Sequence, residues 1–120
     1  MSQHVVTRYV RESADAGQQV ARLRHVLRLV EQIAGSAPSA GHEDAALDEN
    51  ARISSSYGSA PTIIQRRFDA LAAETAAWAA CGIEALLTAR DDAEPPRAAA
   101  RALAQELAGA LRDLRELLQV

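Results

Sequence analysis

The sequence predicts an all-α fold, an antiparallel helical bundle of three long helices plus a short linker helix that resembles a four-helix bundle. Composition favours this class, because 27 of the 120 residues are alanine and 13 are leucine, two of the strongest helix formers. Only four residues are aromatic, and strand-forming residues are sparse. Apolar residues also recur with a helical period. At this length, residues 1–120 are expected to form one domain.

The first long helix is predicted over residues 2–35. Its small and apolar residues recur at spacings of three and four, the period of a helix face that packs on other helices. Gly35 is suited to the left-handed residue that ends a helix. Gly17 is expected either to kink this helix or to let a neighbouring helix approach closely. The stripe consists of Val6, Tyr9, Ser13, Ala16, Val20, Leu23, Leu27, Val30 and Ala34.

Residues 36–60 form a linker that is too long to be structureless inside a compact domain. We predict a short helix around Glu43 to Ser55 that ends at Gly58. Acidic residues at its beginning would favour the positive end of the helix dipole. The residues that fall on one face of this helix are Ala46, Asn50, Ile53 and Tyr57.

The second long helix is predicted over residues 61–90, with Pro61 at its first position and Ser59 as its cap. Alanines surround its apolar stripe, which indicates a central helix on which the others pack closely. Trp78, the largest side chain in this segment, is expected to fill a gap left by the alanines. The stripe consists of Ile64, Phe68, Leu71, Thr75, Trp78, Gly82, Ala85 and Ala89.

The third long helix is predicted over residues 95–119, after the turn that precedes Pro95 and Pro96. Its stripe is Ala100, Leu103, Leu107, Ala110, Leu114 and Leu117. Several stripes are wider than one helix pair can bury, so a fourth layer is needed, either the linker helix or a second subunit. The flanking residues that require this layer are Leu29, Ile33, Ile83, Leu87, Leu111 and Leu118.

Charge argues against nucleic acid as the partner. The formal net charge is −3, whereas proteins that neutralise phosphates are usually basic. The segment 2–35 carries five arginines against three acids, and the linker carries one arginine against four acids. This polarity fits an acidic protein partner or self-association. All 13 basic residues are arginine, a usage typical of a GC-rich bacterial genome.

The sequence also predicts a cytoplasmic protein. Cys81 is the only cysteine, so no intramolecular disulfide can form and a reducing compartment is expected. Residues 1–10 lack the pattern of a signal peptide, and no run of 18 apolar residues occurs. No membrane association is therefore expected.

No set of residues has the spacing that catalysis or metal binding requires. Asp44 and Asp48 lie four apart on the linker helix, but no second ligand pair accompanies them. Cys81 lies beside Ala80 and Gly82 with no histidine within helical reach, which is typical of a packing cysteine. We predict a protein that is not an enzyme and that holds no metal and no cofactor.

Basic residues cluster on the predicted outer side of the first helix, at Arg22, Arg24, His25 and Arg28. His25 is followed by Leu27, Arg28 and, ten residues on, by Gly35. This string of 11 residues resembles the phosphorylatable motif of histidine phosphotransfer domains, which are helical bundles of about this length. The resemblance implies that His25 is phosphorylated beside the positive charge of Arg28. Leu29 departs from the motif, which keeps a glycine there.

Two further functions remain open beside the one that we favour. We predict a small bundle that acts by binding other protein chains, as a homodimer and with the basic cluster as an interaction patch. The alternatives are a phosphocarrier that uses His25 and a bundle that binds a small molecule in a pocket at Phe68 and Trp78.

Overall fold

The structure is a computed structural model that describes residues 2–35, 43–89 and 96–120, with side chains at 16–35, 48–88 and 96–120. The described residues form four α-helices, α1 (Ser2–Ala34), α2 (Glu43–Ser59), α3 (Thr62–Ala89) and α4 (Arg97–Leu118). The described part of the chain contains no strand. The predicted all-α bundle, with three long helices and one short one, is therefore confirmed.

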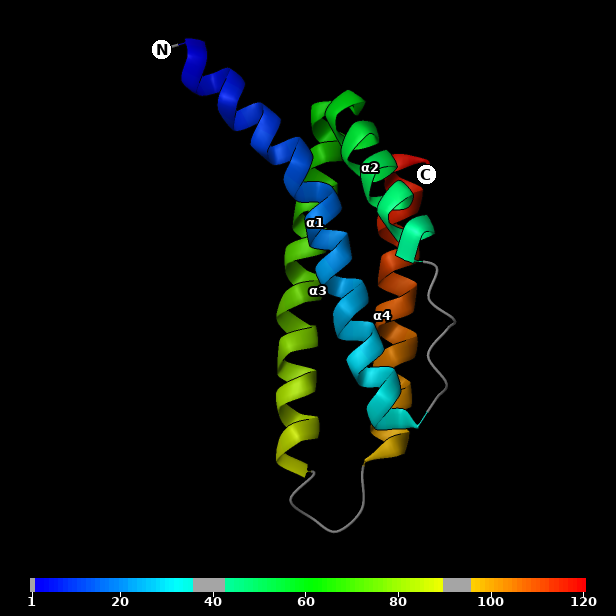
Figure 1. Cartoon of the computed structure of the whole chain (residues 1–120). Helices are drawn as coiled ribbons and strands as arrows, with labels where there is room; N and C mark the ends of the chain where they lie inside the picture. Colours follow the sequence, from blue (N-terminus) through cyan, green and yellow to red (C-terminus); the bar gives the residue numbers. More distant parts are fainter. Residues whose placement is uncertain (1, 36–42, 90–95) are drawn as a thin grey trace.

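Consecutive helices of the bundle run in opposite directions (Figure 1). α1 packs on both α2 and α4, α4 packs on α1 and α3, and α3 has α4 as its main neighbour. α2 covers only one end of the three long helices, and the N-terminal end of α1 extends beyond the others (Figure 1). The molecule is elongated, with a longest extent of 57 Å.

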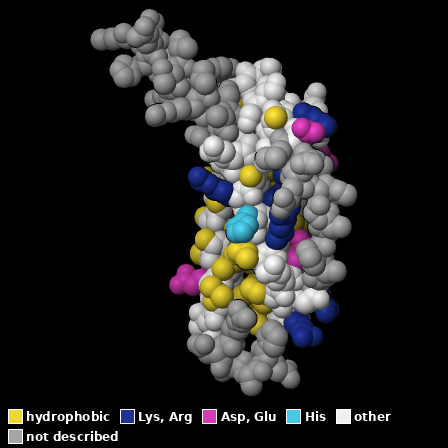
Figure 2. Space-filling model, in the orientation of Figure 1, with side chains coloured by type: hydrophobic (Ala, Val, Ile, Leu, Met, Phe, Trp, Pro, Cys, Tyr) yellow, Lys and Arg dark blue, Asp and Glu magenta, His cyan; other side chains and the backbone are white. Residues whose placement is uncertain are grey.

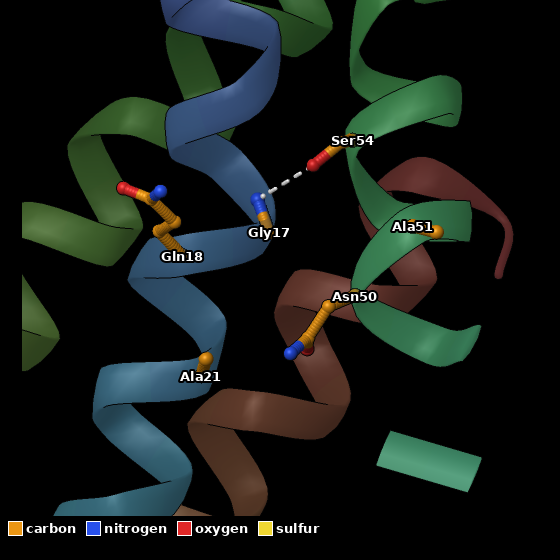
Figure 3. A pocket seen from close by; sticks show the side chains of 6 residues that line it. All are labelled: Gly17, Gln18, Ala21, Asn50, Ala51 and Ser54. Atoms are coloured by element: carbon orange, nitrogen blue, oxygen red, sulfur yellow. Dashed lines mark hydrogen bonds between the residues drawn. The ribbon is translucent and has the colours of Figure 1, made fainter. Parts of the chain in front are cut away.

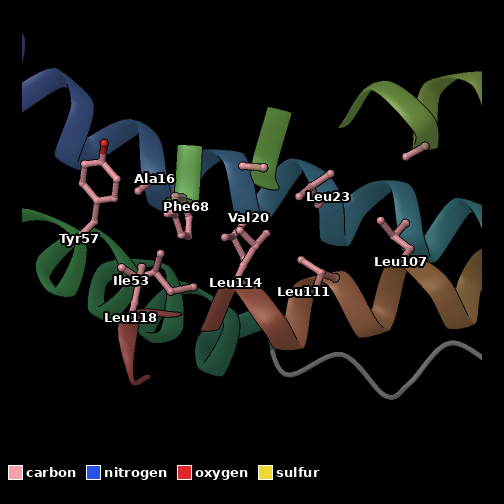
Figure 4. Packing of buried hydrophobic residues seen from close by; sticks show 12 residues of the cluster. Ala16, Val20, Leu23, Ile53, Tyr57, Phe68, Leu107, Leu111, Leu114 and Leu118 are labelled. Carbon is pink, nitrogen blue, oxygen red and sulfur yellow. The ribbon is translucent and has the colours of Figure 1, made fainter. Parts of the chain in front are cut away.

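The stripe predicted for the first helix forms the centre of the core. Ala16, Val20 and Leu23 are buried in one cluster, together with Ile53 and Tyr57 of α2 (Figure 4). Val30 and Ala34 belong to a second cluster, toward the other end of the bundle, with Leu86 and Ala100. Gly35 has φ +76°, the left-handed conformation expected where α1 ends. The side chains of Val6, Tyr9 and Ser13 lie outside the described residues.

The boundaries of α2 and α3 differ from the prediction by a few residues. α2 continues through Gly58 to Ser59, because Gly58 keeps a helical backbone and the turn to α3 follows it. α3 begins at Thr62, and the carbonyl oxygen of Pro61 accepts the N–H groups of Ile64 and Gln65. Pro61 therefore precedes the helix rather than opening it. The side-chain amide of Gln65 donates to the carbonyl oxygen of Tyr57 at 2.7 Å, which ties the two helices at this turn.

The face that α3 buries is rotated from the predicted stripe. Phe68, Ala72, Thr75, Ala79 and Leu86 are buried, whereas the predicted Ala85 is exposed. The reason is that α3 packs mainly on α4. Gly82 of the predicted stripe remains in this interface, close to Leu103. A Cβ at Gly82 would lie 2.8 Å from the Leu103 Cδ2 atom.

The prediction that residues 61–90 form a central helix is wrong. α3 contacts α4 extensively but α1 much less, so it lies at the side of the bundle. The predicted fourth layer exists in part. α2 lies over the end of the bundle where Leu111 and Leu118 are buried, whereas Leu29 and Leu87, toward the other end, are 41% and 51% exposed.

Candidate interaction surface

The backbones of α1 and α2 approach closely where α2 crosses α1 at Gly17. The N–H of Gly17 donates to the hydroxyl oxygen of Ser54 at 3.2 Å (Figure 3). A Cβ at Gly17 would overlap that oxygen and would lie 2.6 Å from the carbonyl oxygen of Asn50. Of the two expectations for Gly17, close approach of a neighbour is therefore confirmed, because only a hydrogen fits between the two backbones.

A surface pocket of about 190 Å³ adjoins this contact. Its polar groups already bind inside the protein, since Ser54 accepts the N–H of Gly17 and Asn50 accepts a hydrogen bond from Arg24 at 2.9 Å. The pocket is smaller than typical small-molecule sites of about 300–1,000 Å³. It contains no charged group that could act as an acid or a base. The lining residues are Gly17, Gln18, Ala21, Asn50, Ala51 and Ser54 (Figure 3).

Glu49 joins three helices through two arginines. Its carboxylate lies 2.9 Å from the Arg24 guanidinium of α1 and 3.1 Å from that of Arg115 of α4. Partly exposed ion pairs of this kind contribute about 0–1 kcal/mol each. The acidic linker residue Glu49 thus has a structural role in holding α2 against the bundle, and the described residues contain no group of acids, histidines and cysteines arranged to bind a metal.

The predicted basic cluster is divided between two sides of α1. Arg22, His25 and Arg28 are exposed, whereas the Arg24 side chain is only 19% exposed and pairs with Glu49. Arg28 lies four residues after Arg24, but its side chain is exposed like those of Arg22 and His25. The surface patch therefore contains three of the four residues that the sequence analysis grouped.

Phe68 and Trp78 occupy different environments on α3. Phe68 is fully buried and makes an edge-to-face contact with Tyr57, with ring centroids 5.5 Å apart. The hydroxyl of Tyr57 donates to the carboxylate of Asp69 at 3.0 Å. Trp78 is partly buried against the same core cluster. The pocket beside Gly17 contains neither Phe68 nor Trp78, and a ligand site at these two residues remains a prediction.

α3 combines the most apolar composition with limited burial. Its segment Thr62–Thr88 is the one described helix that is long and apolar enough to cross a membrane by length and composition alone. The core helices of soluble proteins pass the same test, but only 22% of the apolar window is buried in this structure. Apolar surface on α3 is therefore left without a partner among the described residues.

The outer face of α3 carries a second regular stripe, opposite the buried one. Every position in it is exposed, and the spacings alternate between three and four residues. Ile63 and Leu87, at its ends, are 60% and 51% exposed. No charged residue occurs between Thr75 and Ile83 anywhere around the helix. The stripe, here called the outer stripe, consists of Ile63, Arg66, Ala70, Ala73, Ala77, Ala80, Glu84 and Leu87.

Apolar side chains also gather where α1 runs beside the C-terminal half of α3 (Figure 2). Leu29 of α1 is 41% exposed, and Ile33 and Ile83 are partly exposed. Exposed apolar area of this kind is typical of an interaction site.

The sequence analysis missed the outer stripe, although its signal was present. The sequence analysis assigns the alanines of residues 70–80 to close packing with other helices of the same chain. The spacing of three and four residues from Ile63 through Ala70 and Ala77 to Leu87 indicates a second face on this helix.

Comparisons with known proteins add no assignment: no family model, curated protein or solved structure is significantly similar to this chain.

Proposed function

We propose that this protein is a small interaction bundle without enzymatic activity, which acts by binding protein chains and which forms a homodimer. The observation that carries the proposal is the outer stripe of α3, which is exposed at all eight positions and apolar at six of them. A mostly apolar face that is exposed on a folded protein is typical of an interaction site. A second protein surface on α3 would supply the missing burial.

The chemistry of the outer stripe favours a protein partner over a lipid surface. The exposed Glu74 lies beside the midpoint of Thr62–Thr88, and a charged side chain near the centre of a spanning helix is unfavourable in lipid. Arg66 and Glu84 are two further charges within the stripe itself. The alanines between them bury little area in lipid. Small side chains instead let two helix backbones approach closely, to about 8 Å between axes.

The absence of a reactive constellation among the described residues supports a binding role. The Cys81 side chain is exposed, and no histidine, lysine or arginine lies within one helical turn of it to lower the pKa of a thiol. The pocket at the α1–α2 contact contains no titratable side chain.

The mass of the full chain in solution tests this proposal. We expect a concentration-dependent rise from 12.8 kDa to twice that value in sedimentation equilibrium, with dissociation in the micromolar range, about −8 kcal/mol. A monomer at 200 µM would contradict the homodimer. Flotation of the chain with phosphatidylcholine and phosphatidylglycerol vesicles, in place of self-association, would show that lipid is the partner.

A phosphocarrier that uses His25 is the second candidate. The observation that favours it is the exposure of His25 on a bundle helix, with Arg28 exposed one turn along. The wild-type chain and the H25A variant would be incubated with phosphoramidate, and the intact mass would then be measured. A phosphoryl gain that is lost in H25A supports this function, and an unchanged mass in both chains excludes transfer from this donor.

A further inference from the structure

We infer that the homodimer forms by antiparallel pairing of α3 with α3 of a second copy, about a two-fold axis that crosses the outer stripe at the level of residue 75, between Ala73 and Ala77. This inference rests on the proposed homodimer and specifies its interface and orientation. It comes from the order of residues in the outer stripe, which is symmetric about position 75.

Four layers of contact follow from this symmetry. In an antiparallel pair centred on position 75, two residues meet when their numbers add to 150. All eight residues of the outer stripe then find a partner, and none is left over. The layers are Ile63 with Leu87, Arg66 with Glu84, Ala70 with Ala80, and Ala73 with Ala77, each formed twice by the symmetry. A two-fold interface must be self-complementary in this way.

The chemistry of each layer matches its place along the helix. The two central layers contain only alanine, so the helices can approach most closely there. The next layer places the Arg66 guanidinium beside the Glu84 carboxylate of the other copy, which is charge complementary. The outermost layer joins Ile63 and Leu87, the two most exposed large apolar residues of α3.

A parallel arrangement of the same two helices does not give this match. Parallel pairing in register would place Arg66 beside its own copy and Glu84 beside its own copy, and like charges in contact are unfavourable. The stripe alternates between positions that are followed by a step of three residues and positions that are followed by a step of four. In the antiparallel pair, each layer joins one position of each kind. The outer stripe therefore specifies direction as well as contact.

In the monomer, the face of α3 opposite the outer stripe is packed in the core, which holds the helix in place. Phe68, Ala72, Thr75 and Ala79 are buried on the opposite face of the same helix turns. Gly82 holds α3 close to Leu103 of α4. The layers from position 63 to position 87 span about 36 Å, at a rise of 1.5 Å per residue. The interface is thus a rigid rod on the side of the bundle, and docking requires no rearrangement.

Disulfide trapping of mixed chains tests the inference. Two variants are made in a C81S background, one with A73C and the other with A77C. Each carries one cysteine, and both substitutions are small and lie on the exposed face. The inference places residue 73 of one copy opposite residue 77 of the other, within the distance of about 4.4–6.8 Å between Cα atoms that a disulfide needs. We expect rapid oxidation to a cross-linked dimer in the mixture, at least fivefold faster than in either variant alone.

The possible results distinguish a wrong interface from the absence of a dimer. Faster cross-linking of the single variants than of the mixture would show parallel pairing and overturn the inference. A chain that sediments as a dimer but forms no disulfide in the mixture pairs through another face, which overturns the inference and leaves the proposed function in place. A chain that stays monomeric overturns both. The C81S chain without added cysteines, analysed by sedimentation, is the control that the background substitution preserves the dimer.

Discussion

Small side chains allow two surfaces of this protein to accept a helix at close range, and only one of them has its helix within the described chain. At the α1–α2 contact, Gly17 lies directly against Ser54 and Asn50, and polar bonds hold the two helices together. On α3, the alanines of the outer stripe are exposed. Small residues on a helix therefore allow another backbone to approach, but they do not by themselves determine whether a helix of the same chain lies there.

We expect the largest effect on affinity from a charge placed in the outer stripe of α3. The A77E substitution would put two carboxylates into the central layers of the inferred dimer, where burial without a partner is unfavourable. We expect the dissociation constant to rise about 100-fold, which equals about 2.7 kcal/mol. Sedimentation equilibrium measures this change.

A102E is the matched control for A77E. Ala102 is also an exposed alanine inside a long helix, on α4, outside both described core clusters. It should leave the dimer unchanged within twofold. Equal weakening by A77E and A102E would show that α3 has no special role.

A substitution at the α1–α2 contact is expected to change the free energy of unfolding of the monomer. The G17A variant would force a methyl group into the backbone of α2 at Asn50, and overpacking of this kind destabilises by about 1–3 kcal/mol. Urea unfolding, followed by circular dichroism, measures the change.

G109A is the control for G17A, because the same glycine-to-alanine change is expected to raise the free energy of unfolding at this position. A Cβ at Gly109 would meet no described atom within 4 Å, so the substitution should stabilise helix α4 by up to about 1 kcal/mol. If G17A were also stabilising, the close contact between α1 and α2 would be wrong.

The buried face of α3 offers a third test, at Thr75. This side chain is fully buried, and its hydroxyl has no hydrogen-bond partner among the described residues. T75V keeps the shape and removes the unsatisfied group, so we expect a gain of about 1 kcal/mol in the free energy of unfolding. T88V is the control, because the exposed Thr88 hydroxyl donates to the Glu84 carbonyl oxygen at 2.9 Å and its loss should not stabilise. A loss of stability in T75V would indicate that the hydroxyl has a partner after all.

The smallest effect is expected from the charged layer. R66E and E84R would each replace an attractive pair by a repulsive one, and exposed pairs of this kind are worth about 0.2–1 kcal/mol. We expect either single variant to weaken the dimer about two- to fivefold, which equals about 0.4–1 kcal/mol, and the double variant R66E/E84R to recover most of the affinity. Additive weakening in the double variant would contradict contact between the two positions.

Much of the fold could be predicted from the sequence. The regular stripe through Ala16, Val20 and Leu23, together with the left-handed Gly35, identified the first helix and its end. The choice of partner for each helix could not be predicted, because periodicity gives the direction of a face and not what covers it. Arg24 illustrates this, since its place near Glu49 depends on how the linker helix returns along α1.

The misplaced role of α3 has the same origin. Its alanines indicated close packing, but a helix with small residues on several faces has no single direction in which to be buried. Only the positions of α1 and α4 show that the face with Phe68 and Thr75 is inside and that the face with Ala73 and Ala77 is outside.

The orientation of α3 in the dimer can be measured directly as a distance between two spin labels. A nitroxide attached to A85C in the C81S background would lie on the exposed side of α3, beside the outer stripe rather than within it. Antiparallel pairing about position 75 separates the two labelled residues by 20 residue rises, about 30 Å along the helix axes. Double electron–electron resonance should therefore give one main distance of about 30–35 Å, whereas a main distance below about 20 Å would show parallel helices and contradict the account.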